Sequence, residues 1–237
     1  MNHENCCTID ENARSGFKLI FDLIEQPETI EDLQSLVLQS HQVKKFERTI
    51  LAWIARYYIE QGFFPSEETI SKELNSDLKT LNEILHSARD KGMLTFDNEN
   101  KITGAYGVSS LPTSHSFFIN DRRIHVWCAI DSLGIPLVLN ENTEIQSKCR
   151  YCKEPISIVI HGNNLEKFNP NIIVFVGFSG EVQKASEDFC PYINYFCSME
   201  HLQEWKKNRS TVKGVSMTIP MAGRLSQSIF LPFADVP

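Results

Sequence analysis

The spacing of the apolar residues changes near Gly92, and this change limits the fold classes open to the chain. Before Gly92, apolar side chains recur every three or four residues, as on one face of a helix. Beyond it, short apolar runs bounded by turn residues are typical of strands. We therefore predict an α+β protein, with a helical and winged-helix-like domain over residues 1–107 and an α+β domain with a central sheet over residues 108–237.

The first of these domains contains the clearest helix signals. Helices are predicted over residues 13–25 and 42–61, and Gly62 marks the end of the second. A shorter helix follows Ser66 as N-cap, and another follows the turn at residues 75–77. On the helix over 42–61 we expect one buried stripe, formed by Val43, Phe46, Ile50, Trp53 and Tyr57.

Two short predicted strands, residues 93–96 and 101–104, follow these helices, and the order of elements is that of a winged helix. Such units often bind DNA, but the second helix of this one is nearly neutral. Its charged residues are Lys79, Glu83, Arg89, Asp90 and Lys91. We therefore favour a winged helix used as scaffold.

The second domain is predicted to follow a connector rich in Ser, Pro and Thr, residues 108–118. Beyond it, the pattern predicts a mixture of helices and strands. The expected helices cover residues 126–139 and 199–207, and the expected strands cover 144–147, 156–160 and 172–177.

The composition excludes several classes of function. A formal charge of −7 argues against a protein that grips phosphate backbones, so no nucleic acid partner is expected. The apolar runs are far shorter than the roughly 20 residues of a membrane span, and residues 1–5 lack the pattern of a secretion signal. We expect a cytoplasmic protein with no membrane partner. Its seven cysteines should then be thiols that bind metal, act in catalysis or are buried.

Cys128 and Asp131 form the first candidate site. Three residues apart at a predicted helix start, they would share one face, and a thiolate is a soft ligand that prefers soft metal ions. Cys128 alone would be better explained as core, because free cysteines are often buried. Burying a carboxylate costs free energy unless the group forms an ion pair or is protonated. The combination of Cys128 with Asp131 therefore favours a functional site over a core cysteine. Burial beside sulfur would raise the pKa of Asp131, as an acid catalyst requires.

A second group of residues has the spacing of zinc ligands. Cys149 and Cys152 form a Cys-x-x-Cys pair, and Cys197 and His201 form a Cys-x-x-x-His pair like the second half of a treble-clef module. Structural zinc and buried thiols both remain open for this group. Cys6 and Cys7 precede any ordered pattern, and we place them in a terminal tail.

Three segments together resemble the organomercurial (alkylmercury) lyase family. They are residues 104–108 leading to Pro112-Thr113-Ser114-His115, then Trp127-Cys128-Ala129-Ile130-Asp131, and then residues 189–196, which contain Cys190. Cys-x-x-Asp alone is weak evidence, but the order and separations of all three are much more specific. The resemblance covers residues 42–205. We expect His115, within the first segment, to be an interdomain hydrogen-bonding residue rather than a catalyst.

The resemblance implies protonolysis of a carbon–mercury bond, which releases a hydrocarbon and leaves Hg(II) as bound product. By position, Cys128 and Cys190 would bind the mercury and Asp131 would be the acid. The implied substrate is a small organomercurial, no cofactor is required, and the product would pass to cellular thiols or to a mercuric reductase.

Two departures from the family's pattern put the natural substrate in doubt. The well-known members have a second cysteine directly after the Phe-Cys pair, where this chain has Pro191, and the chain adds Cys152 and Cys197. One alternative is therefore a non-enzymatic carrier or sensor of zinc, copper or mercury. Another is a metal-responsive regulator that acts through the winged helix, which the acidic balance disfavours.

Overall fold

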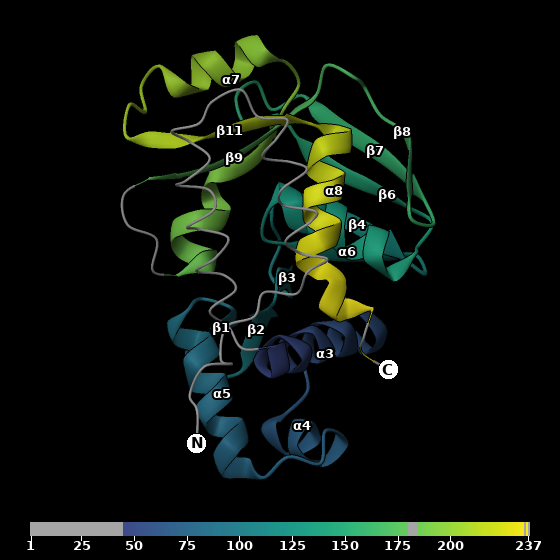
Figure 1. The fold of residues 1–237 in the computed structure, drawn as a ribbon, viewed down its shortest axis with the longest axis vertical. Helices are drawn as coiled ribbons and strands as arrows, with labels where there is room; N and C mark the ends of the chain where they lie inside the picture. The colour runs from purple at the N-terminus through teal and green to yellow at the C-terminus, as the bar shows by residue number, and fades with distance from the viewer. Residues whose placement is uncertain (1–44, 180–183, 235, 237) are drawn as a thin grey trace, which may run out of the picture.

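Two antiparallel sheets and the helices packed on them form the fold in the computed structural model, which describes residues 45–179, 184–234 and 236 (Figure 1). The larger sheet has eight strands in the order β1-β2-β3-β5-β4-β6-β7-β8, and the smaller has the order β10-β9-β11. The mixed α+β class predicted from the sequence, with an N-terminal helical region, is confirmed.

The bounds of the elements are as follows. The strands are β1 Leu94–Phe96, β2 Ile102–Ala105, β3 Val108–Ser109, β4 His115–Ile119, β5 Arg122–Val126, β6 Thr143–Lys148, β7 Pro155–His161, β8 Asn164–Lys167, β9 Ile173–Ser179, β10 Ile193–Phe196 and β11 Val212–Thr218. The α-helices are α3 Lys45–Gln61, α4 Glu67–Glu73, α5 Leu78–Asp90, α6 Ala129–Leu139, α7 Met199–Lys206 and α8 Ile219–Phe230. Short helices of other types are η1 Ala185–Phe189, η2 Cys190–Tyr192 and η3 Leu231–Phe233.

Helices α3, α4 and α5 lie together at one end of the molecule (Figure 1). Helix α3 is followed by Gly62, whose φ of +87° is easily reached by a residue without Cβ. Ser66 caps α4 by accepting a hydrogen bond from the N–H of Thr69 at 3.2 Å, and Asp77 caps α5 in the same way. These three predicted helices are confirmed. The helix predicted over residues 13–25, and with it Cys6 and Cys7, lies outside the described residues.

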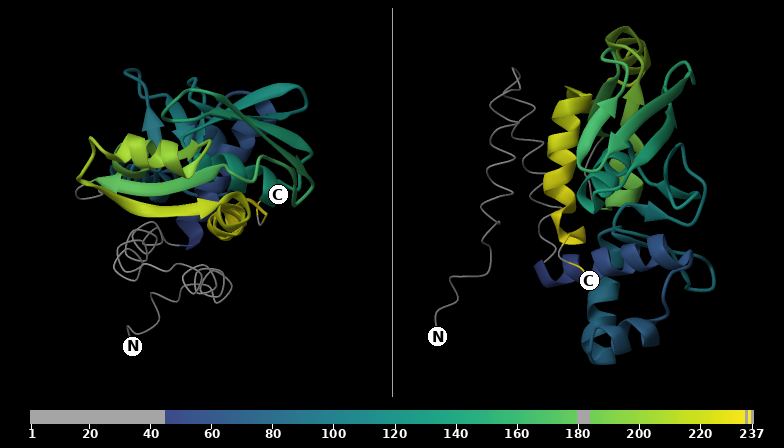
Figure 2. Two further views of the ribbon diagram at one scale, coloured as in Figure 1. Left: turned by 90° about the horizontal axis from the view of Figure 1, so that it is seen from above. Right: turned by 90° about the vertical axis from the view of Figure 1, so that its right-hand side faces the viewer.

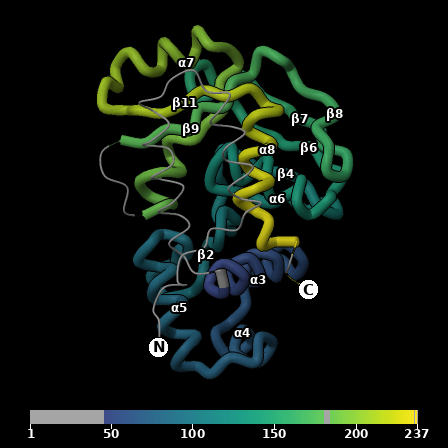
Figure 3. The backbone as a smooth tube through the Cα atoms, in the orientation of Figure 1, coloured from purple at the N-terminus to yellow at the C-terminus, as the bar shows by residue number. Residues whose placement is uncertain are grey.

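The buried face of α3 differs from the predicted stripe. Phe46 is 58% exposed, whereas Leu51 and Ile54 are fully buried. Helix α3 packs against β2 and also against η3 (Figure 3). Its buried face is therefore wider than the predicted stripe and includes Leu51 and Ile54. Arg56 of α3 also contacts the segment after η3, because its guanidinium donates a 2.6 Å hydrogen bond to the carbonyl of Val236.

The predicted hairpin is present as β1 and β2, but it belongs to the larger sheet. Strand β2 pairs with β3, and β3 pairs with β5, so the sheet continues across residues 107 and 108. The connector expected over 108–118 is instead built into this sheet as β3 and most of β4, since its apolar residues Val108 and Phe117 are buried. The winged-helix interpretation and the domain division after residue 107 stay predictions.

Helix α6 lies between the two sheets, where it contacts β4, β5 and β6 of the larger sheet and β9 and β10 of the smaller. Residues 129–137 are all buried, which suits a helix that is apolar on nearly every side. The helix begins later than the predicted residue 126 because Val126 is the last residue of β5.

Helix α8 packs along α6 and also contacts β9 and β11 of the smaller sheet. Figure 2 shows α8, in yellow, beside the sheets. The two helices approach closely at Gly134, where a Cβ would lie 2.3 Å from the Phe230 ring. The sequence pattern predicted no element over residues 212–233, although Pro220 in the first turn of α8 is compatible with a helix start. Among the described helices, none has both the length and the apolar character needed to cross a membrane.

Candidate active site and a second thiol cluster

Cys190 is far in the sequence from Cys128 and Asp131, but the three side chains converge in the structure. One sulfur or carboxylate oxygen of each lies within 4.8 Å of the others, and all three side chains are buried. Cys128 is the N-cap of α6, Asp131 lies in the first turn of that helix, and Cys190 follows η1. The grouping inferred from the sequence is therefore a real spatial cluster, while the roles of its members stay a proposal.

The local geometry of Cys128 and Asp131 is that of a capping box, with cysteine in the place of the usual serine or threonine. The backbone N–H of Cys128 donates to the Oδ2 atom of Asp131 at 2.8 Å, and the N–H of Asp131 donates to the Cys128 sulfur. The box satisfies two backbone groups at the start of α6. It also fixes the carboxyl group beside the sulfur.

Cys190 is positioned through contacts with the N-terminal helical region. The N–H of Ala185 in η1 donates to the carbonyl of Lys91 at 2.9 Å, and the N–H of Ser186 donates to that of Gly92 at 3.2 Å. Gly92 has a φ of +65°, and a Cβ at this position would lie 2.8 Å from the Ala185 nitrogen. The close approach at Gly92 therefore holds the segment that leads to Cys190.

Burial shifts the protonation of the three groups towards their neutral forms. It raises the pKa of Asp131 to about 7, against the lowering effect of the hydrogen bonds from Cys128. It also raises the pKa of Cys128 well above its ordinary value, with further contributions from Cys190 and Asp131. A hydrogen bond from Cys128 lowers the pKa of Cys190, but burial and Asp131 raise it overall. Near neutral pH the cluster thus retains protons that it can donate.

The three groups line a cavity of about 90 Å³ whose walls are mainly apolar. The residues that form its walls come from elements throughout the fold. Their proximity therefore could not be predicted from local sequence patterns. The apolar residues lining it are Met93, Tyr106, Trp127, Ile130, Val176, Ala185, Phe189, Ile193, Leu225, Ile229 and Phe230. The volume exceeds that needed for one water molecule and suits a small organic group.

Gly107 also lines this cavity, although no role for it was predicted from the sequence. Its φ is +93°, and a Cβ there would lie 2.9 Å from the Cγ of Asp131. Its carbonyl accepts a 2.8 Å hydrogen bond from the N–H of Trp127. Gly107 therefore lets the backbone pass close to the carboxyl group. The signal available in the sequence was its place in the segment of residues 104–108.

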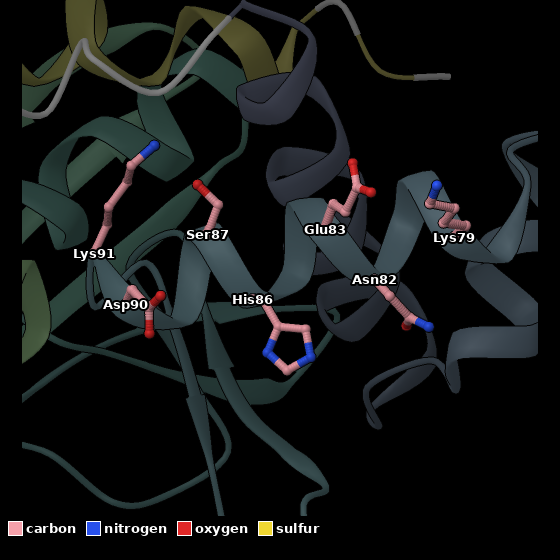
Figure 4. A pocket seen from close by; sticks show the side chains of 7 residues that line it. All are labelled: Lys79, Asn82, Glu83, His86, Ser87, Asp90 and Lys91. Carbon is pink, nitrogen blue, oxygen red and sulfur yellow. The ribbon is translucent and has the colours of Figure 1, made fainter.

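A larger, open depression of about 900 Å³ lies over α5, and the described residues that line it include no cysteine (Figure 4). The charged side chains around it are of both signs, with Lys79 and Lys91 beside Glu83 and Asp90. Lys91 also pairs with Glu47 at 3.5 Å. This mixed surface is not the concentrated positive charge that a phosphate backbone attracts.

The second candidate group also comes together. Cys149, Cys152, Cys197 and His201 place one sulfur or nitrogen atom each within 4.8 Å of the others. The first two lie in the turn between β6 and β7, and the other two lie between the end of β10 and the first turn of α7. Four soft or borderline donors at this separation form a cluster that could hold a metal ion.

His115 is buried behind the candidate active site rather than in its cavity. Its Nδ1 atom lies 2.9 Å from the hydroxyl of Ser147 in β6, and its ring is 5.7 Å from that of Tyr195. Burial lowers the pKa of His115 to about 4, so the ring is neutral at pH 7. These contacts fit a hydrogen-bonding role, but both partners lie within residues 108–237, so the interdomain role expected for His115 stays a prediction.

The part of the chain that contains this site is similar to known proteins. The family profile of MerB, alkylmercury lyase, matches residues 108–231. An alkylmercury lyase of Bacillus cereus is 20% identical over 156 residues, which are 65% of this chain and 71% of that protein. One from Staphylococcus epidermidis is 22% identical over 163 residues, which are 67% and 74%. The crystal structure of the mercury-bound form of MerB2 superposes with a TM-score of 0.71 at 22% identity, covering 94% of this chain and 100% of that one, which shows a shared fold. Because the family profile spans more than half of the sequence and includes Cys128, Asp131 and Cys190, the chain belongs to the alkylmercury lyase family.

Proposed function

We propose that this protein is an organomercurial lyase whose reaction takes place at Cys128, Cys190 and Asp131. The observation that carries the proposal is the convergence of two buried thiols and one buried carboxyl group on a small apolar cavity. Two sulfurs suit a soft ion such as mercury. The carboxyl group is placed to protonate a carbon bound to that ion. The family relationship and the mercury-bound MerB2 of the same fold support this substrate class.

The reaction balances with groups present in the cluster. The sulfur of Cys128 displaces a thiolate from the incoming organomercurial, and the thiol proton leaves with that thiolate. The sulfur of Cys190 then bonds to mercury, and its proton passes to Asp131 as Asp131 gives its own proton to the carbon. The electron pair of the mercury–carbon bond becomes the carbon–hydrogen bond, and mercury stays in the +2 state on the two sulfurs.

The raised pKa of Asp131 supports its role as the acid. With a pKa of about 7, a large fraction of the carboxyl groups carries a proton at neutral pH, and the donor is matched to the working pH. A carboxyl group with an ordinary pKa near 3.8 would be almost entirely ionised. Burial of this one residue is thus what makes the proton available.

We propose that the N-terminal region acts as scaffold, in agreement with the winged-helix interpretation, rather than as a DNA-binding unit. The contacts of Lys91 and Gly92 with η1 position the segment before Cys190, and Met93 and Tyr106 form part of the cavity wall. The mixed charges over α5 also fit a scaffold. A binding assay with duplex DNA at low salt tests this role, and tight, salt-dependent binding would contradict it.

The lyase proposal is tested by gas chromatography of the headspace above the full chain mixed with methylmercury and excess thiol. We expect methane from the wild type, and none above background from Cys128→Ser or Cys190→Ser, because one sulfur cannot both capture mercury and activate its bond to carbon. Circular dichroism of each variant checks that the fold is retained.

The same experiment distinguishes the lyase from the alternative function, a non-enzymatic carrier or sensor of soft metals. If the wild type binds methylmercury stoichiometrically, as seen by intact-protein mass, but releases no methane, the chain is a soft-metal carrier or sensor. Near-normal methane release by either serine variant would remove that cysteine from the mechanism.

A further inference from the structure

The second thiol cluster is assembled from two local structures that hold their donor atoms independently. One is the tight turn after β6, in which the N–H of Cys149 donates to the carbonyl of Glu154 at 2.8 Å and the N–H of Lys153 donates to the carbonyl of Cys149 at 3.0 Å. Lys153 closes this turn with a φ of +69°. The other is the start of α7, where Ser198 is the N-cap and places His201 in the first turn. The turn is held by backbone hydrogen bonds, and the start of α7 is held by the Ser198 hydroxyl, which accepts a 3.3 Å hydrogen bond from the N–H of His201.

Two distances between the donor atoms match those of a tetrahedral zinc site. With Zn–S bonds of about 2.3 Å and Zn–N bonds of about 2.05 Å, a tetrahedron places two sulfurs about 3.8 Å apart and a sulfur about 3.6 Å from a nitrogen. The sulfurs of Cys152 and Cys197 are 3.6 Å apart, and the Cys149 sulfur is 3.8 Å from Nδ1 of His201. The sulfur of Cys197 lies 2.8 Å from the same nitrogen, so this pair would have to open by about 0.8 Å to bind zinc.

We propose that Cys149, Cys152, Cys197 and His201 bind one structural Zn²⁺ ion, which joins the larger sheet to the smaller one behind the candidate active site. Four protein ligands close the coordination shell, so no position is left for water or substrate. The ion is therefore structural, and the site shares no residue with the cluster of Cys128, Asp131 and Cys190. The inference stands apart from the proposed lyase activity.

The two parts of the zinc site are linked to the start of α6 through Tyr195 in β10. The N–H of Arg150, in the turn after β6, donates to the Tyr195 carbonyl at 2.9 Å. The Tyr195 hydroxyl lies 2.8 Å from the hydroxyl of Ser132 and donates to the carbonyl of Ala129 at 3.1 Å. Zinc that fixes this turn against β10 therefore also steadies the strand that supports the first turn of α6, beside Cys128.

The test is the zinc content of the full chain, expressed in zinc-supplemented medium and purified with a reducing agent and no chelator. We expect about one zinc per chain in the wild type and less than about a third of that in Cys152→Ser, because three ligands hold zinc far more weakly than four. Cys152 is exposed, so its substitution disturbs packing least. Cys190→Ser is the matched control, since it removes a thiol from the other cluster and should keep its zinc.

A second measurement keeps the test decisive if Cys152→Ser does not fold. Wild-type protein stripped of zinc and loaded with Co²⁺ should show the visible bands of tetrahedral cobalt with sulfur-to-metal charge transfer. The proposal would be overturned if the wild type contains no zinc when purified and also shows no such spectrum after Co²⁺ is added. A disulfide between Cys152 and Cys197 in the freshly purified protein, or equal loss of zinc from Cys190→Ser, would also overturn it. No organomercurial is added, so these outcomes are independent of lyase activity.

Discussion

The backbone N–H of Cys128 donates a 2.8 Å hydrogen bond to the carboxylate of Asp131, and the N–H of Asp131 donates to the sulfur of Cys128 in return. This reciprocal contact holds a buried acid beside a buried thiol at the start of α6. Because the carboxyl group has few polar partners in the apolar cavity, burial dominates and raises its pKa to about 7. The same two residues thus define both the position and the protonation of the proposed acid.

Asp131→Asn should separate mercury binding from proton transfer. The substitution keeps the size of the side chain but removes its transferable proton, while both thiols remain. We expect the variant to take up methylmercury, seen as a mass increase of the intact protein, and to release methane at least about 100-fold more slowly, at the low end of what a positioned general acid contributes. A wild-type rate would show that Asp131 is structural. If the variant folds but fails to bind, Asp131 instead orders the thiols.

The raised pKa of Asp131 should make stability depend on pH. The folded protein holds this proton more tightly than the unfolded chain, whose carboxyl has an ordinary pKa near 3.8, so the stabilisation is complete below that pH and is lost as pH rises through about 7. Three pKa units correspond to about 4 kcal/mol, an upper figure for the effect. Urea unfolding from about pH 4 to 8 should therefore show the wild type losing stability relative to Asp131→Asn. Both proteins contain His115, so the effect of its titration on stability cancels when the two are compared. A stability difference between them that does not change with pH would contradict the raised pKa of Asp131.

Gly107→Ala should reduce activity by crowding Asp131. The new Cβ would lie 2.9 Å from Cγ of Asp131, and the φ of +93° adds strain. Gly62→Ala is the matched control, because its φ is +87° but, among the described residues, its Cβ would meet the flexible end of Arg122. Both variants should lose about 1 kcal/mol of stability from the backbone strain. Only Gly107→Ala should also lower kcat/KM for methylmercury, by at least about tenfold, through displacement of the acid. Equal activities of the two variants would show that Asp131 tolerates the displacement.

Local signals in the sequence determined the elements with strong caps and regular spacing. The N-cap Ser66, the turn at residues 75–77, the stop at Gly62 and the apolar spacing of residues 78–88 were sufficient to predict α3, α4 and α5. These signals act within one or two turns of a helix, so they do not depend on the rest of the fold. Motif order likewise indicated the family, and residue type with spacing selected the two candidate clusters.

Only the tertiary structure decided which of these residues meet and what surrounds them. Cys190 joins Cys128 because η1 is held against the end of α5, a contact between residues far apart in the sequence. The walls of the cavity, the close approach of Gly107 and the whole of α8 had no strong local signal. The raised pKa of Asp131 arises from desolvation, which depends on every element packed around it. The sequence therefore determined the chemical groups, while long-range packing decided their protonation and their geometry.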